Sequence, residues 1–296
     1  MEFCHIAPTP HLDLVTEYKA HLTLAHIIYE EMQEAHEPKT GYRGKGAPTP
    51  YIDFYSRRVS GVNIMDNGAF ELYKAGQPMF PAELLIEMGR KINANYIVLP
   101  DTPAHPSMVG IDDAKLYAPQ FKDAGFGTFF VPQSDIGDIE DLCTSFAWAA
   151  SCPLIDYIGI SILAVPNAYN CEANAHVKHV KMQRFVSRWK FMNELKARGL
   201  LNLAYNNGKK IHMLGMVDGP NEIALLKDFH IDTWDSSCAV WNGLNGIGFD
   251  KSPTGLMEGK KDDMHVDFSF KTEDDKSIEI AKLNMNYIDV LSEGVA

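Results

Sequence analysis

The sequence lacks the features of several large classes of protein. None of its 296 residues belongs to an apolar run near the ~18 residues that a membrane-spanning helix needs, and there is no low-complexity tract. The first residues, Met-Glu-Phe-Cys-His, have no basic region followed by an apolar stretch, so no secretory signal is expected. Aromatic residues make up 10% of the chain, which argues against a disordered or fibrous class. These absences predict a globular cytoplasmic protein with no membrane partner.

Paired cysteines are also missing. The five cysteines, Cys4, Cys143, Cys152, Cys171 and Cys238, form no CxxC or CxC pair. An odd number, wide spacing and no export signal favour reduced thiols over a disulfide framework. The same spacing argues against a four-cysteine zinc site, and no metal or other cofactor is expected.

Positive charge is scarce overall but concentrated in one segment. The chain has 27 Lys and Arg against 39 Asp and Glu, a net charge of −12, which disfavours nonspecific binding to nucleic acid. The segment from Lys178 to Lys210, however, holds many Lys and Arg residues and a single acid, Glu194. This pattern indicates either a solvated helix surface or a face for a polyanionic partner.

Short apolar segments alternate with helical patterns along the whole chain. The expected strands are Phe3–Ile6, His21–His26, Val62–Asp66, Tyr96–Asp101, Gly127–Pro132, Asp156–Ser161, Lys210–Gly215 and Asp232–Ser236. Helical periodicity covers Ala82–Asn93, Val177–Arg198, Pro220–Phe229 and Asp275–Leu291. Eight strands alternating with helices predict an α/β fold, a single-domain (β/α)8 TIM-like barrel spanning residues 1–296.

An open, doubly wound sheet is the alternative fold. It usually has a glycine-rich phosphate turn after its first strand, and this sequence has none. Two segments, 37–50 and 239–272, are expected to be irregular insertions or loops. Within the second, the glycine-rich stretch Gly243–Gly248 is typical of a flexible loop.

Polar side chains stand at the ends of several expected strands. Asp66, Asp101, Gln133 and Asp235 each end an apolar strand or directly follow one. A single Asp at such a place is commonly a helix cap or a turn former. Barrel enzymes build their sites from the carboxyl ends of different strands, so the repeated placement favours a shared site.

Three carboxylates around one cavity suit chemistry at a sugar carbon. One carboxylate can attack C1′ and hold the glycosyl group covalently, while a second handles the proton of the leaving base. A third carboxylate beside a Gln amide can read the edge of a purine, and a ring such as Phe70 can stack on its face.

These motifs, in chain order, resemble those of the queuine/archaeosine-type tRNA-guanine transglycosylases. Met65-Asp66-Asn67-Gly68-Ala69-Phe70-Glu71 is similar to the family's Asp-Ser-Gly-Gly-(Phe/Tyr)-Gln motif, and Val-Pro-Gln133 is similar to its Val-Gln-Gly segment. The resemblance covers roughly residues 60 to 240 and is closer to shorter relatives that insert 7-deazaguanines into DNA in phages and some bacteria. It implies that Asp66 is the general acid/base and Phe70 the stacking ring. It also implies that Asp101 and Gln133 read the guanine edge.

Three later segments extend the resemblance. Ser161-Ile-Leu163-Ala-Val is similar to a Gly-Gly-Leu-Ala-Val-Gly segment whose backbone contacts the base. His212-Met-Leu-Gly215 is similar to a Tyr-Leu-Met-Gly segment that borders the pocket, and Trp-Asp235-Ser to the Phe-Asp-Cys segment that carries the nucleophile. The resemblance therefore implies that Asp235 is the covalent nucleophile and that Ser161, Leu163 and Gly215 lie against the substrate.

The chain also departs from the family pattern. Asn67, Ala69 and Glu71 replace small or amide residues of the first motif, and Ile162 stands where a glycine is usual. A larger residue at position 162 is expected to narrow the pocket and change which modified base is accepted.

The zinc subdomain of the tRNA enzymes is missing from the sequence. Their Cys-x-Cys-x2-Cys plus His pattern is absent, since Cys238 and His265 are the one cysteine and the one histidine after Asp235. Because that subdomain helps to hold tRNA, its loss favours DNA. We therefore expect a pentosyltransferase that replaces guanine in DNA with a free, preQ0-like 7-deazaguanine base. It would act in the cytoplasm, which would be that of the host if a phage encodes the protein. The sequence leaves open whether the protein forms a homodimer.

Three other functions remain open. The first is the same exchange on tRNA. The second is a non-catalytic subunit that binds nucleic acid, which the presence of both Asp66 and Asp235 disfavours. The third is a metal-dependent barrel hydrolase, since 11 His are available, but no early His-x-His is present and His176-x-x-His179 is more typical of a helix surface.

Overall fold

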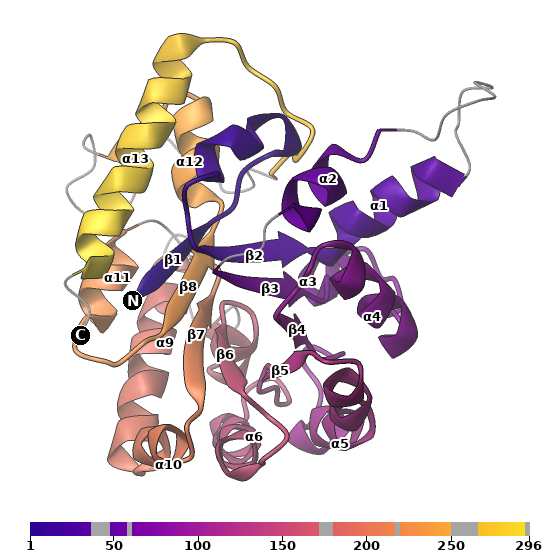
Figure 1. Cartoon of the computed structure of the whole chain (residues 1–296). Helices are drawn as coiled ribbons and strands as arrows, with labels where there is room; N and C mark the ends of the chain where they lie inside the picture. The colour runs from indigo at the N-terminus through magenta and orange to yellow at the C-terminus, as the bar shows by residue number, and fades with distance from the viewer. Residues whose placement is uncertain (37–47, 58–60, 172–179, 217–219, 250–265, 294–296) are drawn as a thin grey trace.

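The eight strands predicted from the sequence all form, and they are parallel. In the computed structural model, which describes residues 1–36, 48–57, 61–171, 180–216, 220–249 and 266–293, they make one sheet in the order β1-β8-β7-β6-β5-β4-β3-β2. The strands are β1 (Glu2–His5), β2 (Ala20–Leu24), β3 (Val62–Asp66), β4 (Tyr96–Val98), β5 (Gly127–Phe130), β6 (Tyr157–Ser161), β7 (Lys210–Leu214) and β8 (Thr233–Ser236). The end strands β1 and β2 contact each other, so the sheet curls into a nearly closed barrel (Figure 1). The predicted (β/α)8 barrel is confirmed.

Helices follow the strands and cover the outside of the barrel (Figure 1). In the first half they are α1 (Ala25–His36), α2 (Pro50–Ser56), α3 (Ala69–Lys74), α4 (Ala82–Lys91), α5 (Ser107–Asp123) and α6 (Ile139–Ser151). In the second half they are α7 (Ala164–Ala168), α9 (Val180–Ala197), α10 (Leu200–Asn206), α11 (Asn221–Leu226), α12 (Cys238–Leu244) and α13 (Asp275–Glu293). Between β1 and β2 the connection is a 3-10 helix, η1 (Thr9–Val15). Among the described residues, no helix combines the length and apolar character needed to cross a membrane.

Alternate residues of the strands point into the barrel, where they form its core. The rings of Phe129 on β5 and Tyr157 on β6 stack with centroids 5.6 Å apart. Phe129 also forms a T-shaped pair with His212 on β7, with centroids 5.3 Å apart. His212 in turn contacts both Thr233 and Asp235 of β8. Because side chains two residues apart share one face of a strand, Thr233 and Asp235 both point inward, with Asp235 nearer the carboxyl end.

One of the two expected irregular segments is partly helical. Residues 239–244 of the 239–272 segment belong to α12, which packs against α13, so the prediction of an irregular loop is wrong for these residues. Gly243 permits this packing, because a Cβ at this position would lie 2.2 Å from the Cα of Ala281. Residues 250–265 of this segment, and 37–47 of the segment 37–50, lie outside the described residues, as do His176 and His179.

The basic segment between Lys178 and Lys210 does not form one charged surface. Arg188 is fully buried and pairs with Glu222 of α11, with 2.6 Å between Nε and the carboxylate. Lys209 is buried at the start of β7, where its ammonium group donates to the carbonyl oxygen of Ile155 at 2.7 Å. Arg198 is neutralised at the surface by acids, among them Glu194 at 2.7 Å. The two buried residues, Arg188 and Lys209, therefore contradict both expectations, whereas Lys190, Lys196 and Arg198 are exposed, as a solvated helix surface requires.

Candidate active site

The four polar residues predicted at strand ends do lie at the carboxyl end of the barrel. Asp66 is the last residue of β3 and Asp235 the third residue of β8. Asp101 and Gln133 each lie three residues beyond the end of their strand, β4 and β5. The negative charges of Asp235 and Asp101 both raise the pKa of Asp66. Such an effect requires that the carboxylates lie near one another. The structure thus brings all four to one mouth.

Asp101 is held by two side-chain amides. Asn67 Nδ2 donates to Oδ1 at 2.7 Å, and Gln133 Nε2 donates to Oδ2 at 2.6 Å. Burial raises the pKa of Asp101 to about 6, although both amide hydrogen bonds favour its ionised form. The remaining polar atom of the pair, Gln133 Oε1, is buried and has no hydrogen-bond partner in the described part of the chain. Asp101 and Gln133 therefore present acceptors to a ligand that donates hydrogen bonds.

Asn67 is a site residue whose role the sequence did not reveal. Its Oδ1 accepts from the backbone N–H of Ala69 at 2.8 Å, and its Nδ2 also donates to the carbonyl oxygen of Leu99 at 2.7 Å. The turn that it stabilises continues through Gly68, which has φ +75° and donates its N–H to Asp66 Oδ2 at 2.9 Å. One turn thus orients two carboxylates, Asp66 directly and Asp101 through Asn67.

Asp235 is held at one of its two oxygens. His212 Nε2 lies 2.8 Å from Oδ1, and the N–H of Gly215 donates to the same oxygen at 3.0 Å. Gly215 has φ +66°, which a glycine adopts at little cost. No hydrogen bond from the described residues reaches Oδ2. The Asp235 carboxylate is therefore fixed through Oδ1.

A buried ion pair supports this side of the mouth. Besides its bond to Glu222, Arg188 donates from Nη1 to the carbonyl oxygens of Ile160 at 3.1 Å and Leu214 at 2.8 Å. Its Nη2 donates to the carbonyl oxygen of Gly215 at 2.9 Å. The guanidinium therefore joins the ends of β6 and β7 and fixes the peptide whose N–H binds Asp235.

Asp66 is suited to carry a proton. Burial raises its pKa well above the usual range, and the charges of Glu71, Asp235 and Asp101 add to that shift. Burial and the charge of Asp235 also raise the pKa of Glu71, whose Oε2 lies 3.8 Å from His26 Nδ1. Since several carboxylates share the mouth, not all of them can be ionised at low energetic cost. Asp66 is the acid whose pKa these neighbours raise most clearly.

The remaining predicted residues lie at the mouth but are engaged within the protein. Phe70 on α3 is half-buried, and the ammonium group of Lys74 lies 4.0 Å from the centre of its ring. Ser161 Oγ accepts from the N–H groups of Leu163 at 2.9 Å and Ala164 at 3.2 Å, which caps α7. The N–H groups of Leu163 and Gly215 are thus bound within the protein, to Ser161 and Asp235. One face of Phe70 is likewise covered by a cation.

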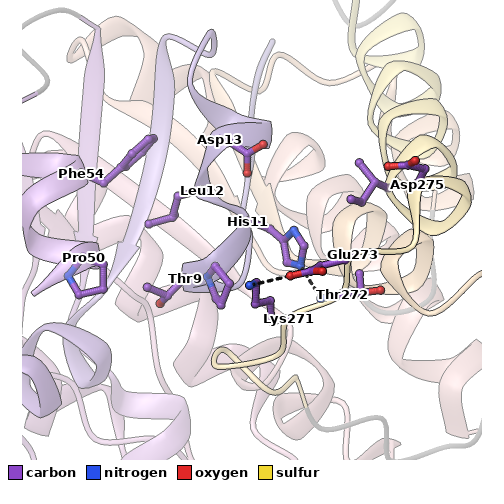
Figure 2. Close-up of a pocket in the computed structure, with 12 residues that line it drawn as sticks. Thr9, His11, Leu12, Asp13, Pro50, Phe54, Lys271, Thr272, Glu273 and Asp275 are labelled. Atoms are coloured by element: carbon purple, nitrogen blue, oxygen red, sulfur yellow. Dashed lines mark hydrogen bonds and ion pairs between the residues drawn. The ribbon is translucent and has the colours of Figure 1, made fainter. Parts of the chain in front are cut away.

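A pocket of about 560 Å³ is lined by a different set of residues (Figure 2). It is formed by η1, the start of α2 and the segment that leads into α13, and it contains His11, Phe54 and Lys271. His11 Nε2 accepts from the N–H of Thr272 at 3.1 Å, so this imidazole nitrogen is occupied. None of the predicted site residues lines this pocket.

No protein-family model matches the chain, and no curated protein matches it. Within the described residues, no three His, Cys, Asp or Glu side chains are grouped so that they could hold a metal ion. Fold and site together define a (β/α)8 barrel with three features at its mouth. They are a carboxylate with one oxygen that no described residue hydrogen-bonds, a second carboxyl of raised pKa, and a pair of hydrogen-bond acceptors.

Proposed function

We propose that the protein is a base-exchange transglycosylase that replaces guanine in DNA with a 7-deazaguanine. The observation that carries the proposal is the arrangement of Asp235 in one mouth with Asp66, whose pKa is raised. Asp235 is fixed at Oδ1, and its Oδ2 receives no hydrogen bond from the described part of the chain. A nucleophile and a proton carrier at one site are what displacement at an anomeric carbon requires.

The acceptor pair supports a guanine-like base. The edge of guanine carries N1–H and an exocyclic amino group, both donors, and an ionised Asp101 beside Gln133 Oε1 can accept from them. Adenine presents an acceptor at N1, which would face the Asp101 carboxylate and repel it. The pair therefore favours guanine and its 7-deaza analogues, which share this edge.

The exchange proceeds in two displacements at C1′ of a nucleotide that has left the base stack. In the first, Oδ2 of Asp235 forms a bond to C1′ as the C1′–N9 bond breaks, and protonated Asp66 gives its proton to the departing guanine. In the second, a free 7-deazaguanine gives its N9 proton to Asp66 and N9 attacks C1′. The bond from C1′ to Asp235 then breaks. Two inversions give net retention, and the enzyme ends in its original protonation state.

A labelled-base assay tests the proposal. The protein is incubated with labelled guanine and, in separate reactions, single-stranded DNA, duplex DNA and tRNA, with labelled adenine as the matched control base. We expect label from guanine, but not from adenine, to enter DNA. Incorporation into tRNA alone would refute DNA as the substrate. Absence of label from all three nucleic acids would refute base exchange itself.

A further inference from the structure

Beyond the two acids of the exchange, His212 is a buried group at the site with no assigned role. We propose that His212 is a positioning residue for the nucleophile: its Nε2–H fixes Oδ1 of Asp235, so that Oδ2 is the oxygen that bonds C1′. The inference rests on the proposed function, which assigns the nucleophile to Asp235. It concerns a position where the family pattern has a tyrosine, so the sequence resemblance does not supply it.

The position of the imidazole is fixed on all sides. His212 is fully buried on β7, and its Nδ1 lies 2.7 Å from the hydroxyl of Thr233 while its Nε2 lies 2.8 Å from Asp235 Oδ1. The ring also forms a T-shaped pair with Phe129, with centroids 5.3 Å apart. Because both nitrogens are bonded and the ring packs against Phe129, the imidazole has a single orientation.

Thr233 and Asp235 set the tautomer of this imidazole. The hydroxyl of Thr233 can donate to Nδ1 of His212, and Nε2–H of His212 can donate to Oδ1 of Asp235. Each proton is used once in this direction. The opposite tautomer would point the lone pair of Nε2 at a carboxylate, which is repulsive.

This hydrogen bond acts on both displacements. When Asp235 attacks, Oδ1 becomes the carbonyl oxygen of the glycosyl ester. When the second base enters, Oδ1 regains negative charge as the ester bond breaks. The Nε2–H of His212 and the N–H of Gly215 both donate to Oδ1, and fixed donors at an atom where charge develops stabilise the transition state.

Three variants test the proposal. His212→Phe removes both ring nitrogens, His212→Gln keeps an N–H donor near the place of Nε2, and Thr233→Val removes the group that fixes the tautomer. We expect His212→Phe to lower kcat of base exchange about 10²-fold, as loss of a donor to a developing charge does, with an unchanged Kd for free guanine. His212→Gln should recover most of this loss, and Thr233→Val should show a smaller one.

The possible failures are distinguishable. If wild-type protein exchanges base and His212→Phe keeps the wild-type kcat, the positioning role is refuted while the proposed function stands. A merely structural role is shown if His212→Phe and His212→Gln lose kcat and base affinity equally. If wild-type protein exchanges no base, the function fails, and the catalytic role of His212 fails with it.

The tautomer itself can be measured without activity. In 15N-histidine NMR spectra, the His212 signal, identified by its loss in His212→Gln, should be that of a neutral ring protonated at Nε2. It should lose this fixed tautomer in Thr233→Val. A ring protonated at Nδ1 alone would overturn the proposal.

Discussion

The two halves of the barrel mouth hold their carboxylates by different means. In the half formed by β3 to β5, Asp101 receives one side-chain amide at each oxygen. In the half formed by β7 and β8, Asp235 receives an imidazole and a backbone N–H at the same oxygen. The first arrangement presents acceptors in a fixed pattern and suits recognition. The second leaves one oxygen without a hydrogen bond from any described residue and suits covalent chemistry.

The largest expected effect separates the two halves. Asp235→Asn removes the proposed nucleophile, so base exchange should fall by about 10⁴-fold or more. Binding of free guanine, measured by calorimetry, should change little, because Asp101 and Gln133 are in the other half. The matched control is Asp232→Asn, whose side chain accepts from the N–H of Ile211 at the opposite end of the strand and should leave exchange unchanged. Full exchange activity in Asp235→Asn would reject the assignment of the nucleophile.

A second prediction concerns the support behind Asp235. Glu222→Gln leaves the fully buried Arg188 without its counter-ion, and breaking a buried pair in this way costs about 3–5 kcal/mol of unfolding free energy. Urea denaturation measures this loss. Glu140→Gln is the matched control, since it breaks a surface pair with Arg198 and should change stability little. Equal unfolding free energies of the Glu222→Gln and Glu140→Gln variants would show that the buried pair does not stabilise the fold.

The fold could be predicted from the sequence because its signals are local. Each strand is a short apolar run, and Val62–Asp66 was predicted with the bounds that the structure has. The errors came from contacts between distant segments. Gly243 was predicted to lie in a loop because glycine weakens helices. In the structure, its lack of a side chain allows α12 to approach Ala281. Arg188 was predicted to be a surface charge. Its buried partner, Glu222, lies 34 residues further along the chain, so no local pattern reveals the pair.

The candidate site was predicted only in part for the same reason. Asp66, Asp101 and Asp235 could be placed because the end of a strand is visible in the sequence. The roles of Asn67 and His212 depend on hydrogen bonds between the ends of neighbouring strands. Which strands are neighbours is set by the strand order, and this order is not visible in the local sequence. One signal was present: Thr233 and Asp235 stand two residues apart on a strand and so face the same side. A polar residue at the matching height of β7, His212, is then expected to meet them.

A third prediction tests the recognition half. Asp101→Asn replaces one acceptor oxygen with an amide that donates, so the group would oppose the N–H donors of guanine. The affinity for free guanine should fall about 10²-fold, as for sites that lose a hydrogen bond to a buried polar group. With base at saturation, kcat should fall far less, which is the reverse of Asp235→Asn. If kcat falls and affinity does not, the two halves do not divide recognition from chemistry.

The smallest expected effect is a pH dependence of guanine affinity, which arises in the half of the mouth formed by β3 to β5. Asp101 has a pKa of about 6 in the folded protein, above the usual value for an aspartate, because it is buried. At pH 7 most molecules carry the Asp101 carboxylate, which would accept hydrogen bonds from guanine. At pH 5 most carry the protonated carboxyl, whose O–H would oppose an N–H of the base. The affinity for guanine should therefore fall about tenfold between pH 7 and pH 5. Calorimetric titrations of wild-type protein and Asp101→Asn measure it, and the variant, which has no carboxyl at this position, should be weak and nearly independent of pH over that range. An equal pH dependence in both proteins would assign the titration to another group, such as Asp66, and would remove the charge of Asp101 from base recognition.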